Sequence, residues 1–386
     1  MKLDLRKFAD HPAETAIITF LVLFSCFVVW VGWTLLPRLE TALNQGGVDD
    51  INKLTLTAAG VFGVYFLVWR TWIADRQRHV AQEQLYMGLL TKAIEQLGAT
   101  RDETLEDGAL RTVANREVRL GAIYALEKLA CDYMALHWQI MEVLCAYVRT
   151  NAGDPAPCSP EIRAIYAKRP RERSKDEHAT LKARTAGLKP SVDVQAALTV
   201  MGRRSEQQKA HEQRSRHLTR QRRLDLSRCQ LAGADLARLD FDGAIFTGSC
   251  LEAAILFRAS FRDALLDEAH LQGAKLESAL LDDVLMFDSH LQGARLGGAS
   301  LRFAHAGDSH FEGAHLAEAD LEGVRLHGAH LHGAALRQAT GLNDNVLSRA
   351  HGDCRTVIPE GLSRPAHWST GGGAAKEIPP PRIARE

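Results

Sequence analysis

Large apolar residues recur at every fifth position between residues 224 and 338, without an insertion or a deletion. The series runs from Leu226 to Leu336, and all 23 of its positions are apolar. A small or apolar residue stands two positions before most of them, as at Ala234 and Ala294. A period of five fits neither an α-helix, with about 3.6 residues per turn, nor a straight strand, whose side chains alternate. We therefore expect the backbone to turn at each repeat and to stack as a solenoid around a continuous apolar core.

This pattern resembles that of the pentapeptide-repeat family, A(D/N)LXX. The segments GADLA (233–237) and EADLE (318–322) match it directly. The resemblance implies a right-handed quadrilateral β-helix over residues 224–340, with four five-residue repeats in each coil. Together with TKAIEQLG (91–98) and IPEGLSRPAHW (358–368), the chain also resembles a membrane-anchored bacterial subgroup that has an N-terminal hairpin and a helical block. Neither resemblance implies an enzymatic activity, because a fold alone does not define a function.

Two apolar runs lie near the N-terminus. Residues 16–36 contain no charged side chain, and as a helix they are long enough to span a hydrocarbon core of about 30 Å. Residues 54–73 form the second run, with Arg70 near its end. The sequence therefore predicts two transmembrane helices joined by a loop over residues 37–53.

The flanking charges predict the orientation of this hairpin. Basic residues precede the first run and follow the second, and few lie in the loop between them. The positive-inside rule places residues 1–15 and 74–150 in the cytoplasm and the 37–53 loop in the periplasm. A cleaved signal peptide explains the first run less well, because no small-residue cleavage site follows it. The expected localisation is the bacterial inner membrane, as a multi-pass protein with both termini cytoplasmic.

Beyond the second run the pattern becomes helical. Within residues 74–150, amphipathic segments at 117–130 and 137–149 are expected to pack as a HEAT-like or armadillo-like layer. An apolar stripe with heptad-like spacing between residues 80 and 97 is compatible with a homodimer formed through this helix.

Turn formers and basic residues divide the rest of the chain. Prolines and a glycine between 151 and 160 end the helical pattern, and residues 151–190 are expected to form a loosely ordered linker. Residues 191–223 are a basic helical segment, of which 191–204 is expected to cap the first coil. The repeat stops after residue 340, so residues 341–386 are assigned to a C-terminal cap and a disordered tail.

A formal net charge of zero conceals two oppositely charged regions. Residues 161–223 carry 17 Lys and Arg against 7 Asp and Glu, a net of +10. Residues 224–340 carry 9 against 17, a net of −8. The basic region fits either a solvated linker that offsets the acidic coils or a surface for anionic lipid.

The sequence lacks the motifs of common enzymes. It contains no glycine-rich phosphate loop, no HExxH, no paired CxxC and no GxSxG segment. The carboxylates of the repeats alternate with basic residues at outward positions, which is typical of a solvated surface. We therefore expect a protein without enzymatic activity or cofactor, and we assign no catalytic, cofactor-binding or metal-ligating residue.

Wrapping the repeats four to a coil places residues 20 apart above one another. His270, His290, His310 and His330 have this spacing, and each precedes an inward apolar residue. They are expected to stack on one outer face at the roughly 4.8 Å spacing of neighbouring strands. Such a ladder is able to bind a divalent metal or to respond to pH, although duplication of one coil is the simpler explanation.

A second column, Ile245, Leu265 and Leu285, points apolar side chains outward and indicates a contact surface. We therefore predict a membrane-anchored scaffold that presents a β-helix to an unknown protein partner. Some soluble pentapeptide-repeat proteins imitate DNA and bind topoisomerases, so a DNA-mimic regulator of a nucleic-acid enzyme is one alternative. A metal- or pH-responsive sensor acting through the histidine ladder is another. Direct nucleic-acid binding is not expected, and Arg262 and Arg302 interrupt the acidic surface that mimicry needs.

Overall fold

The computed structural model describes four long stretches of the chain, residues 48–104, 110–155, 159–216 and 222–368. It also describes ten scattered positions between residues 22 and 41. The predicted N-terminus at 1–15 and most of the predicted span at 16–36 lie outside the described residues, as does the end of the predicted tail, 369–386. The chain divides into two compact units, Met1–Gly88 and Leu89–Glu386.

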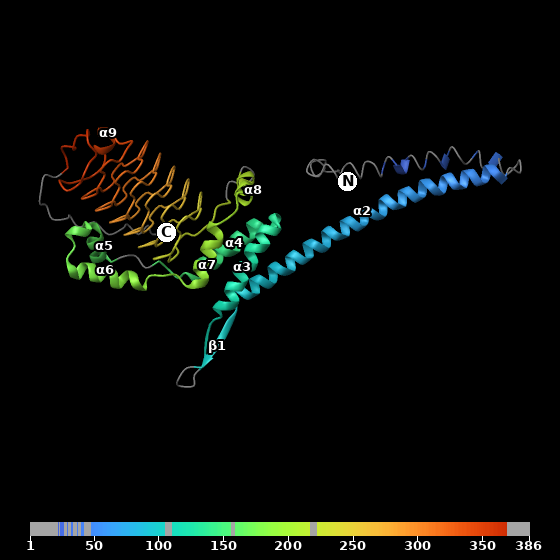
Figure 1. The fold of residues 1–386 in the computed structure, drawn as a ribbon, viewed down its shortest axis with the longest axis horizontal. Helices are drawn as coiled ribbons and strands as arrows, with labels where there is room; N and C mark the ends of the chain where they lie inside the picture. The colour runs from blue at the N-terminus through green and yellow to red at the C-terminus, as the bar shows by residue number, and fades with distance from the viewer. Residues whose placement is uncertain are drawn as a thin grey trace, which may run out of the picture. The chain divides into compact units, whose positions relative to one another are not determined.

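The first unit is dominated by α2 (Val48–Leu97), a helix of 50 residues whose last turns belong to the second unit (Figure 1). Within the first unit, Phe24 stacks on Tyr65 with ring centroids 5.7 Å apart. Tyr65 in turn stacks on Trp69, and Trp69 lies 5.8 Å from Trp72. Because Tyr65, Trp69 and Trp72 are spaced four and three residues apart, their rings lie in a row along one side of α2.

The predicted membrane topology is corrected by this helix. Within the described stretches, no helix is both long enough and apolar enough to cross a bilayer. This finding overturns the predicted multi-pass localisation in a bacterial inner membrane. Residues 54–73 do not form a separate return helix, because α2 starts inside the predicted 37–53 loop and continues past Arg70 into charged sequence.

The second unit opens with a small helical layer. Its elements are, in order, β1 (Thr100–Thr104), β2 (Leu110–Ala114), α3 (Arg116–Asp132), η2 (Met134–Leu136), α4 (His137–Asn151) and α7 (Val192–Gly202). The two strands form an antiparallel hairpin, and the helices α3, α4 and α7 pack on one another. Leu126, Leu144 and Leu198, one from each helix, are fully buried. The layer expected over residues 117–149 is therefore joined by a third helix that comes from much later in the chain.

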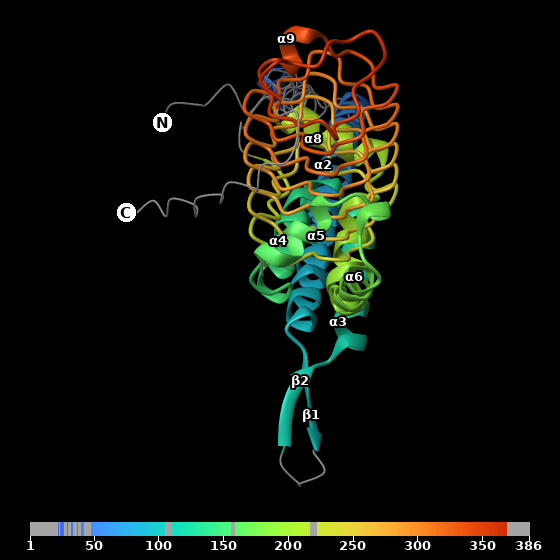
Figure 2. The same ribbon diagram turned by 90° about the vertical axis from the view of Figure 1, so that its left-hand side faces the viewer.

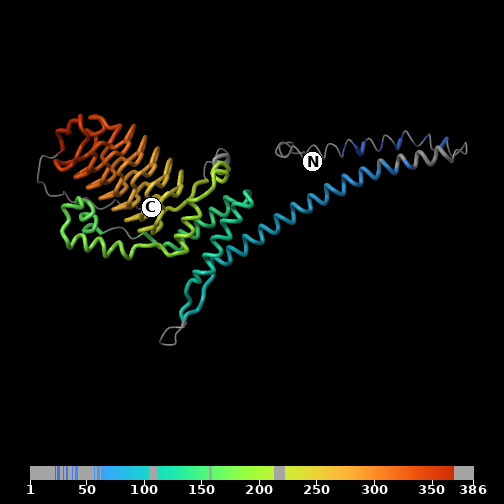
Figure 3. The backbone as a smooth tube through the Cα atoms, viewed as in Figure 1, coloured from blue at the N-terminus to red at the C-terminus, as the bar shows by residue number. Residues whose placement is uncertain are grey.

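Residues 225–340 coil into a β-helix in which each coil bonds to the next (Figure 3). Parallel bridges join residues 20 apart in an unbroken series, from Asp225–Ile245 to Asp320–Thr340. All 23 apolar residues of the five-residue pattern, of which Ala306 is the one small member, point inward and are buried. The solenoid predicted from that pattern is therefore confirmed.

Helices and loops close the first coil. Its backbone N–H groups have no preceding coil to bond, yet Gln230 donates to the Gly153 carbonyl at 3.2 Å and Asp240 to the Gly202 carbonyl at 2.8 Å. The amide of Gln195 on α7 receives the Asp235 N–H at 3.0 Å and donates to the Asp235 carbonyl. Residues 191–204 thus cap this edge, as expected, and satisfy groups that otherwise invite pairing with other chains.

The last coil is closed by residues 344–368. Leu331 donates its N–H to the His351 carbonyl and Leu336 to the Val357 carbonyl, both at 2.7 Å. The short helix α9 (Asp344–Leu347) precedes these residues, and the Trp368 ring, 1% exposed, packs against Gly352 and donates to the Ala350 carbonyl.

Residues 159–190, which we call the strap, run along one face of the β-helix (Figures 1 and 2). The strap contains α5 (Pro160–Ala167), η3 (Pro170–Glu172) and α6 (Lys175–Gly187). The expectation of a loosely ordered linker over 151–190 is therefore not met. Pro160 and Pro170 stand at first helical positions, where a missing N–H costs nothing, so these prolines begin helices instead of interrupting them.

Candidate functional site

The histidine ladder lies on the face that the strap covers. Ring centroids are 4.9 Å apart between His270 and His290, and 4.8 Å apart at each of the next two steps to His310 and His330. His351 extends the stack at 5.3 Å. The predicted column is thus confirmed, but its rings are half-buried and do not form an open outer face.

A column of glycines lets the strap approach this face. A Cβ atom at Gly233, Gly293 or Gly313 would overlap a backbone carbonyl of the strap, and one at Gly273 would overlap the Tyr166 ring. The backbone conformation is not the cause, because 13 non-glycine residues hold the same corner position of other repeats, with φ between 53° and 62°. Glycine is therefore required here by the close approach of a second segment.

A buried ion pair fastens the strap to the coil. Glu252 follows an inward leucine on the covered face and has no exposed surface. Arg184 of α6 donates to both of its carboxylate oxygens at 2.6 Å, and the Tyr166 hydroxyl donates to one of them at 3.2 Å. The charge of Glu252 is thus balanced by a two-pronged guanidinium contact.

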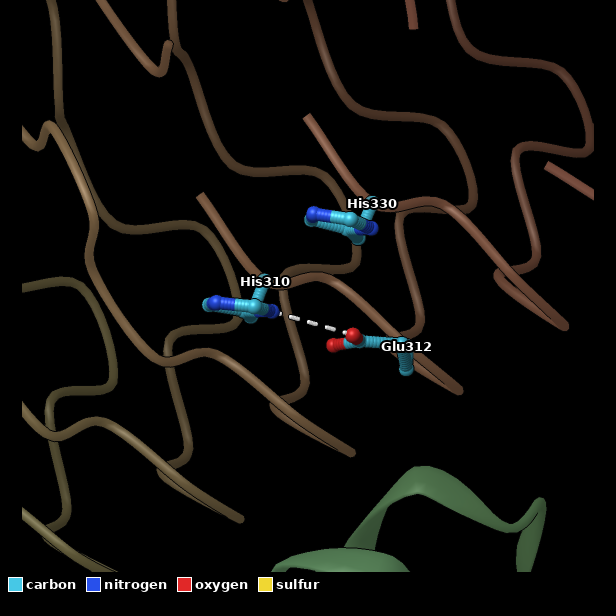
Figure 4. Close-up of side chains that lie close together, drawn as sticks. All are labelled: His310, Glu312 and His330. Atoms are coloured by element: carbon cyan, nitrogen blue, oxygen red, sulfur yellow. Dashed lines mark hydrogen bonds and ion pairs between the residues drawn. The ribbon is translucent and has the colours of Figure 1, made fainter. Parts of the chain in front are cut away.

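Glu312 occupies the equivalent position three coils later and has a different environment. His310 Nδ1 lies 3.0 Å from its Oε1, and among the described residues its buried Oε2 has no hydrogen-bond partner. Figure 4 shows the Glu312 carboxylate pointing toward the His310 ring, with the His330 ring stacked in the same orientation. One ligand atom from each of these three residues lies within 4.8 Å of the others.

Burial keeps much of the ladder neutral. Burial, together with the neighbouring His310 and His270 rings and Arg163, lowers the pKa of His290 to about 3. Burial likewise lowers the pKa of His270 and of His330 below the ordinary value. At neutral pH these imidazoles therefore carry a free lone pair instead of a positive charge.

A second candidate surface lies away from the strap. Phe287 and Phe303 are 42% and 48% exposed, and their rings lie over Gly307 and Gly323 of the next coil. The Phe287 ring meets His305 edge to face at 6.0 Å, and His305 pairs with Leu285 below it. We call Leu285, Phe287, Phe303 and His305 the aromatic corner. It continues the predicted Ile245–Leu265–Leu285 column. Neither phenylalanine was predicted from the sequence, because both lie outside the inward positions of the five-residue pattern.

Two arginines of the β-helix, Arg262 and Arg302, pair with acidic residues of a neighbouring coil. Arg262 lies 3.2 Å from Asp282, and Arg302 lies 2.8 Å from Glu322 and 3.8 Å from Asp320. These exposed pairs span neighbouring coils and interrupt the acidic surface of the β-helix.

Comparisons with known proteins agree with the fold. A family model described as pentapeptide repeats matches residues 225–263, 264–302 and 307–340, in eight copies. No curated protein sequence matches the chain.

Three solved structures illustrate the similarity. Rfr23, a pentapeptide repeat protein from the cyanobacterium Cyanothece 51142, is 25% identical over 26% of this chain and 63% of its own length, with a TM-score of 0.18. QnrB1, a plasmid-mediated fluoroquinolone resistance protein, is 20% identical over 37% of this chain and 69% of its own, with a TM-score of 0.25. A pentapeptide repeat protein from the Arabidopsis thaliana thylakoid lumen is 31% identical over 26% of this chain and 64% of its own length, with a TM-score of 0.15. By their repeats and their coil, residues 225–340 form a pentapeptide-repeat domain.

Proposed function

We propose that the protein is a non-enzymatic scaffold whose β-helix presents a rigid surface to a protein partner. The regular series of bridges supports this role, because a stack held at every coil keeps its outward side chains at fixed spacing. A partner that fits such a surface loses little binding energy to ordering it.

The aromatic corner is the observation that carries the proposal. Phe287 and Phe303 are each more than two fifths exposed, the Phe287 ring meets His305, and Arg302 lies 5.9 Å from the centre of the Phe303 ring. Aromatic residues are enriched in protein interfaces and cluster at their energetic centres, whereas the charged pairs around them suit a polar rim. The corner therefore has the composition of a binding surface.

The DNA-mimic alternative is less well supported. Mimicry needs a continuous acidic surface, and Arg262 and Arg302 each pair with acidic residues in the middle of the coils. A supercoiling assay with purified gyrase and an excess of the full chain tests it, since mimicry predicts inhibition and the scaffold proposal predicts none.

Crosslinking in cells of the source organism tests the scaffold proposal. A tagged chain with a photoreactive amino acid in place of Phe303 is expected to capture a defined protein that a tag-only control does not. The double variant Phe287→Ser and Leu285→Ser, in the same photoreactive chain, is expected to lose it. The control variant Lys275→Ser and Glu318→Ser, exposed on another face, is expected to retain it. A chain that captures nothing above the tag-only control, or a corner variant that captures as much as the control variant, contradicts the proposal.

A further inference from the structure

The covered face carries two glutamates at equivalent positions, and only Glu252 is paired with an arginine. Glu252 and Glu312 are separated by three coils, and each follows an inward residue of the same column. Arg184 neutralises Glu252, but the only ion pair of Glu312 among the described residues is with His310. A carboxylate with a buried, unpaired oxygen is costly unless a positive charge accompanies it.

The groups around Glu312 are those that bind a transition metal. His310 and Glu312 flank Phe311 and come from one coil, and His330 stacks on His310 from the next coil. Two imidazole nitrogens and a carboxylate oxygen make a mixed nitrogen and oxygen donor set that suits Zn²⁺ and its neighbours in the first transition series.

We propose that His310, Glu312 and His330 form a binding site for one divalent transition-metal ion, with solvent completing the coordination. This site goes beyond the proposed scaffold function, which does not depend on it. An ion there supplies the positive charge at Glu312 that Arg184 supplies at Glu252, and it ties two consecutive coils together beside the strap.

The geometry needs only side-chain rotation to close around an ion. The three ligand atoms now lie within 4.8 Å of one another. Bonds of about 2.0 to 2.2 Å to a tetrahedral ion bring such atoms to roughly 3.3 Å apart. Closing the difference of about 1.5 Å requires the parallel His310 and His330 rings to tilt toward each other as well as rotation of Glu312. The backbone bridge His310–His330 is left in place.

Metal titration of the purified full chain tests this site. After removal of metal with a chelator, Zn²⁺ is titrated in competition with a chromogenic chelator, and the thermal unfolding midpoint is measured with and without the ion. We expect one ion per chain with micromolar or tighter affinity and a higher unfolding midpoint. Glu312→Gln, which keeps the shape of the side chain, and His330→Ala are each expected to weaken binding by at least about tenfold.

A ladder histidine outside the site provides the matched control. His270 lies two coils before His310, stacks on His290 and has Gln272 where His310 has Glu312. The variant His270→Ala is therefore expected to bind Zn²⁺ as the wild type does. Co²⁺ bound by this site is expected to absorb in the visible region without a thiolate charge-transfer band, because no cysteine takes part. Absence of binding in the wild type, equal binding by Glu312→Gln and His270→Ala, or a thiolate band overturns the proposal.

Discussion

The covered face and the aromatic corner are built from the same repeat, at the same coil spacing, and differ at the corner position of the repeat. On the covered face that position is glycine in all coils but one, and strap atoms lie against four of these glycines, Gly233, Gly273, Gly293 and Gly313. At the aromatic corner it holds Phe303 with φ of 55°, and the ring projects to solvent. The difference teaches that the repeat itself tolerates side chains there, so a column of glycines marks a face on which another segment lies.

Removing the strap's cation is expected to have the largest effect. Arg184→Met leaves the buried Glu252 carboxylate without its arginine, although the Tyr166 hydroxyl still donates to it. This loss costs about 3 kcal/mol, the lower end of the range for broken buried pairs, because Arg184 is 28% exposed. Cleavage of the strap by thermolysin is expected to become more than about a hundredfold faster, since each 1.4 kcal/mol is a factor of about ten.

The double variant serves as the control for this change. Adding Glu252→Gln removes the stranded charge, so Arg184→Met with Glu252→Gln is expected to resist thermolysin better than Arg184→Met alone. Equal or faster cleavage of the double variant shows that the pair does not hold the strap.

Filling the glycine column is expected to have the next largest effect. Gly293→Ala places a Cβ against the Tyr166 carbonyl and should destabilise the strap by about 1–3 kcal/mol, the usual cost of overpacking. Gly248→Ala is matched in φ, 66° against 65°, but its Cβ makes only an ordinary contact with Arg228. Thermal unfolding of the two variants therefore separates the close approach from the backbone conformation, and equal losses contradict a covered face.

A smaller effect is expected from pH. Burial and Arg163 of α5 lower the pKa of His270, whereas Glu252 raises it, and the neutral His290 ring stacks on it. Because the folded pKa lies below the unfolded value of about 6.5, the contribution to stability is fully present above that pH and is lost as the pH falls toward the folded pKa. With a chelator present, the unfolding midpoint of the wild type should fall more steeply below pH 6.5 than that of His270→Gln. Parallel profiles refute this role.

The aromatic corner should contribute least to stability. Phe287→Ser and Phe303→Ser remove rings that are already about half exposed, so each is expected to lower the free energy of unfolding by no more than about 1 kcal/mol. Urea unfolding measures this, with Phe261→Ser, from the buried core, as the contrasting variant expected to lose several times more. Losses similar to that of Phe261→Ser show that the corner is part of the fold and not a free surface.

The sequence predicted the coil well because its core is local and periodic. Every inward residue from Leu226 to Leu336 follows from the five-residue rule, and the histidine column follows from wrapping that rule four times. The strap was missed because the prolines between 151 and 160 were taken to end the helical pattern, although Pro160 begins a helix. The signal for the strap in the sequence was the glycine that recurs every 20 residues on the covered face, as at Gly273, Gly293 and Gly313.

The Glu312 environment was beyond sequence reasoning. Its distinction from Glu252 depends on where Arg184 of the strap falls, a contact between residues 68 positions apart. The predicted membrane spans rested on apolar length alone, and α2 shows that an apolar run such as 54–73 is also able to lie within a longer helix that carries charged residues.

Hydrogen exchange of the strap in the full chain tests the central comparison most directly. If residues 160–187 are held on the covered face, the α6 amides should exchange more slowly than those of an unfolded peptide by a factor of a thousand or more, corresponding to roughly 4 kcal/mol. Arg184→Met should remove most of that protection and leave the β-helix amides, such as those of Leu271 and Leu291, unchanged. Exchange of the wild-type strap at the rate of an unfolded peptide contradicts the account, because the strap would then be the loose linker that its prolines first indicated.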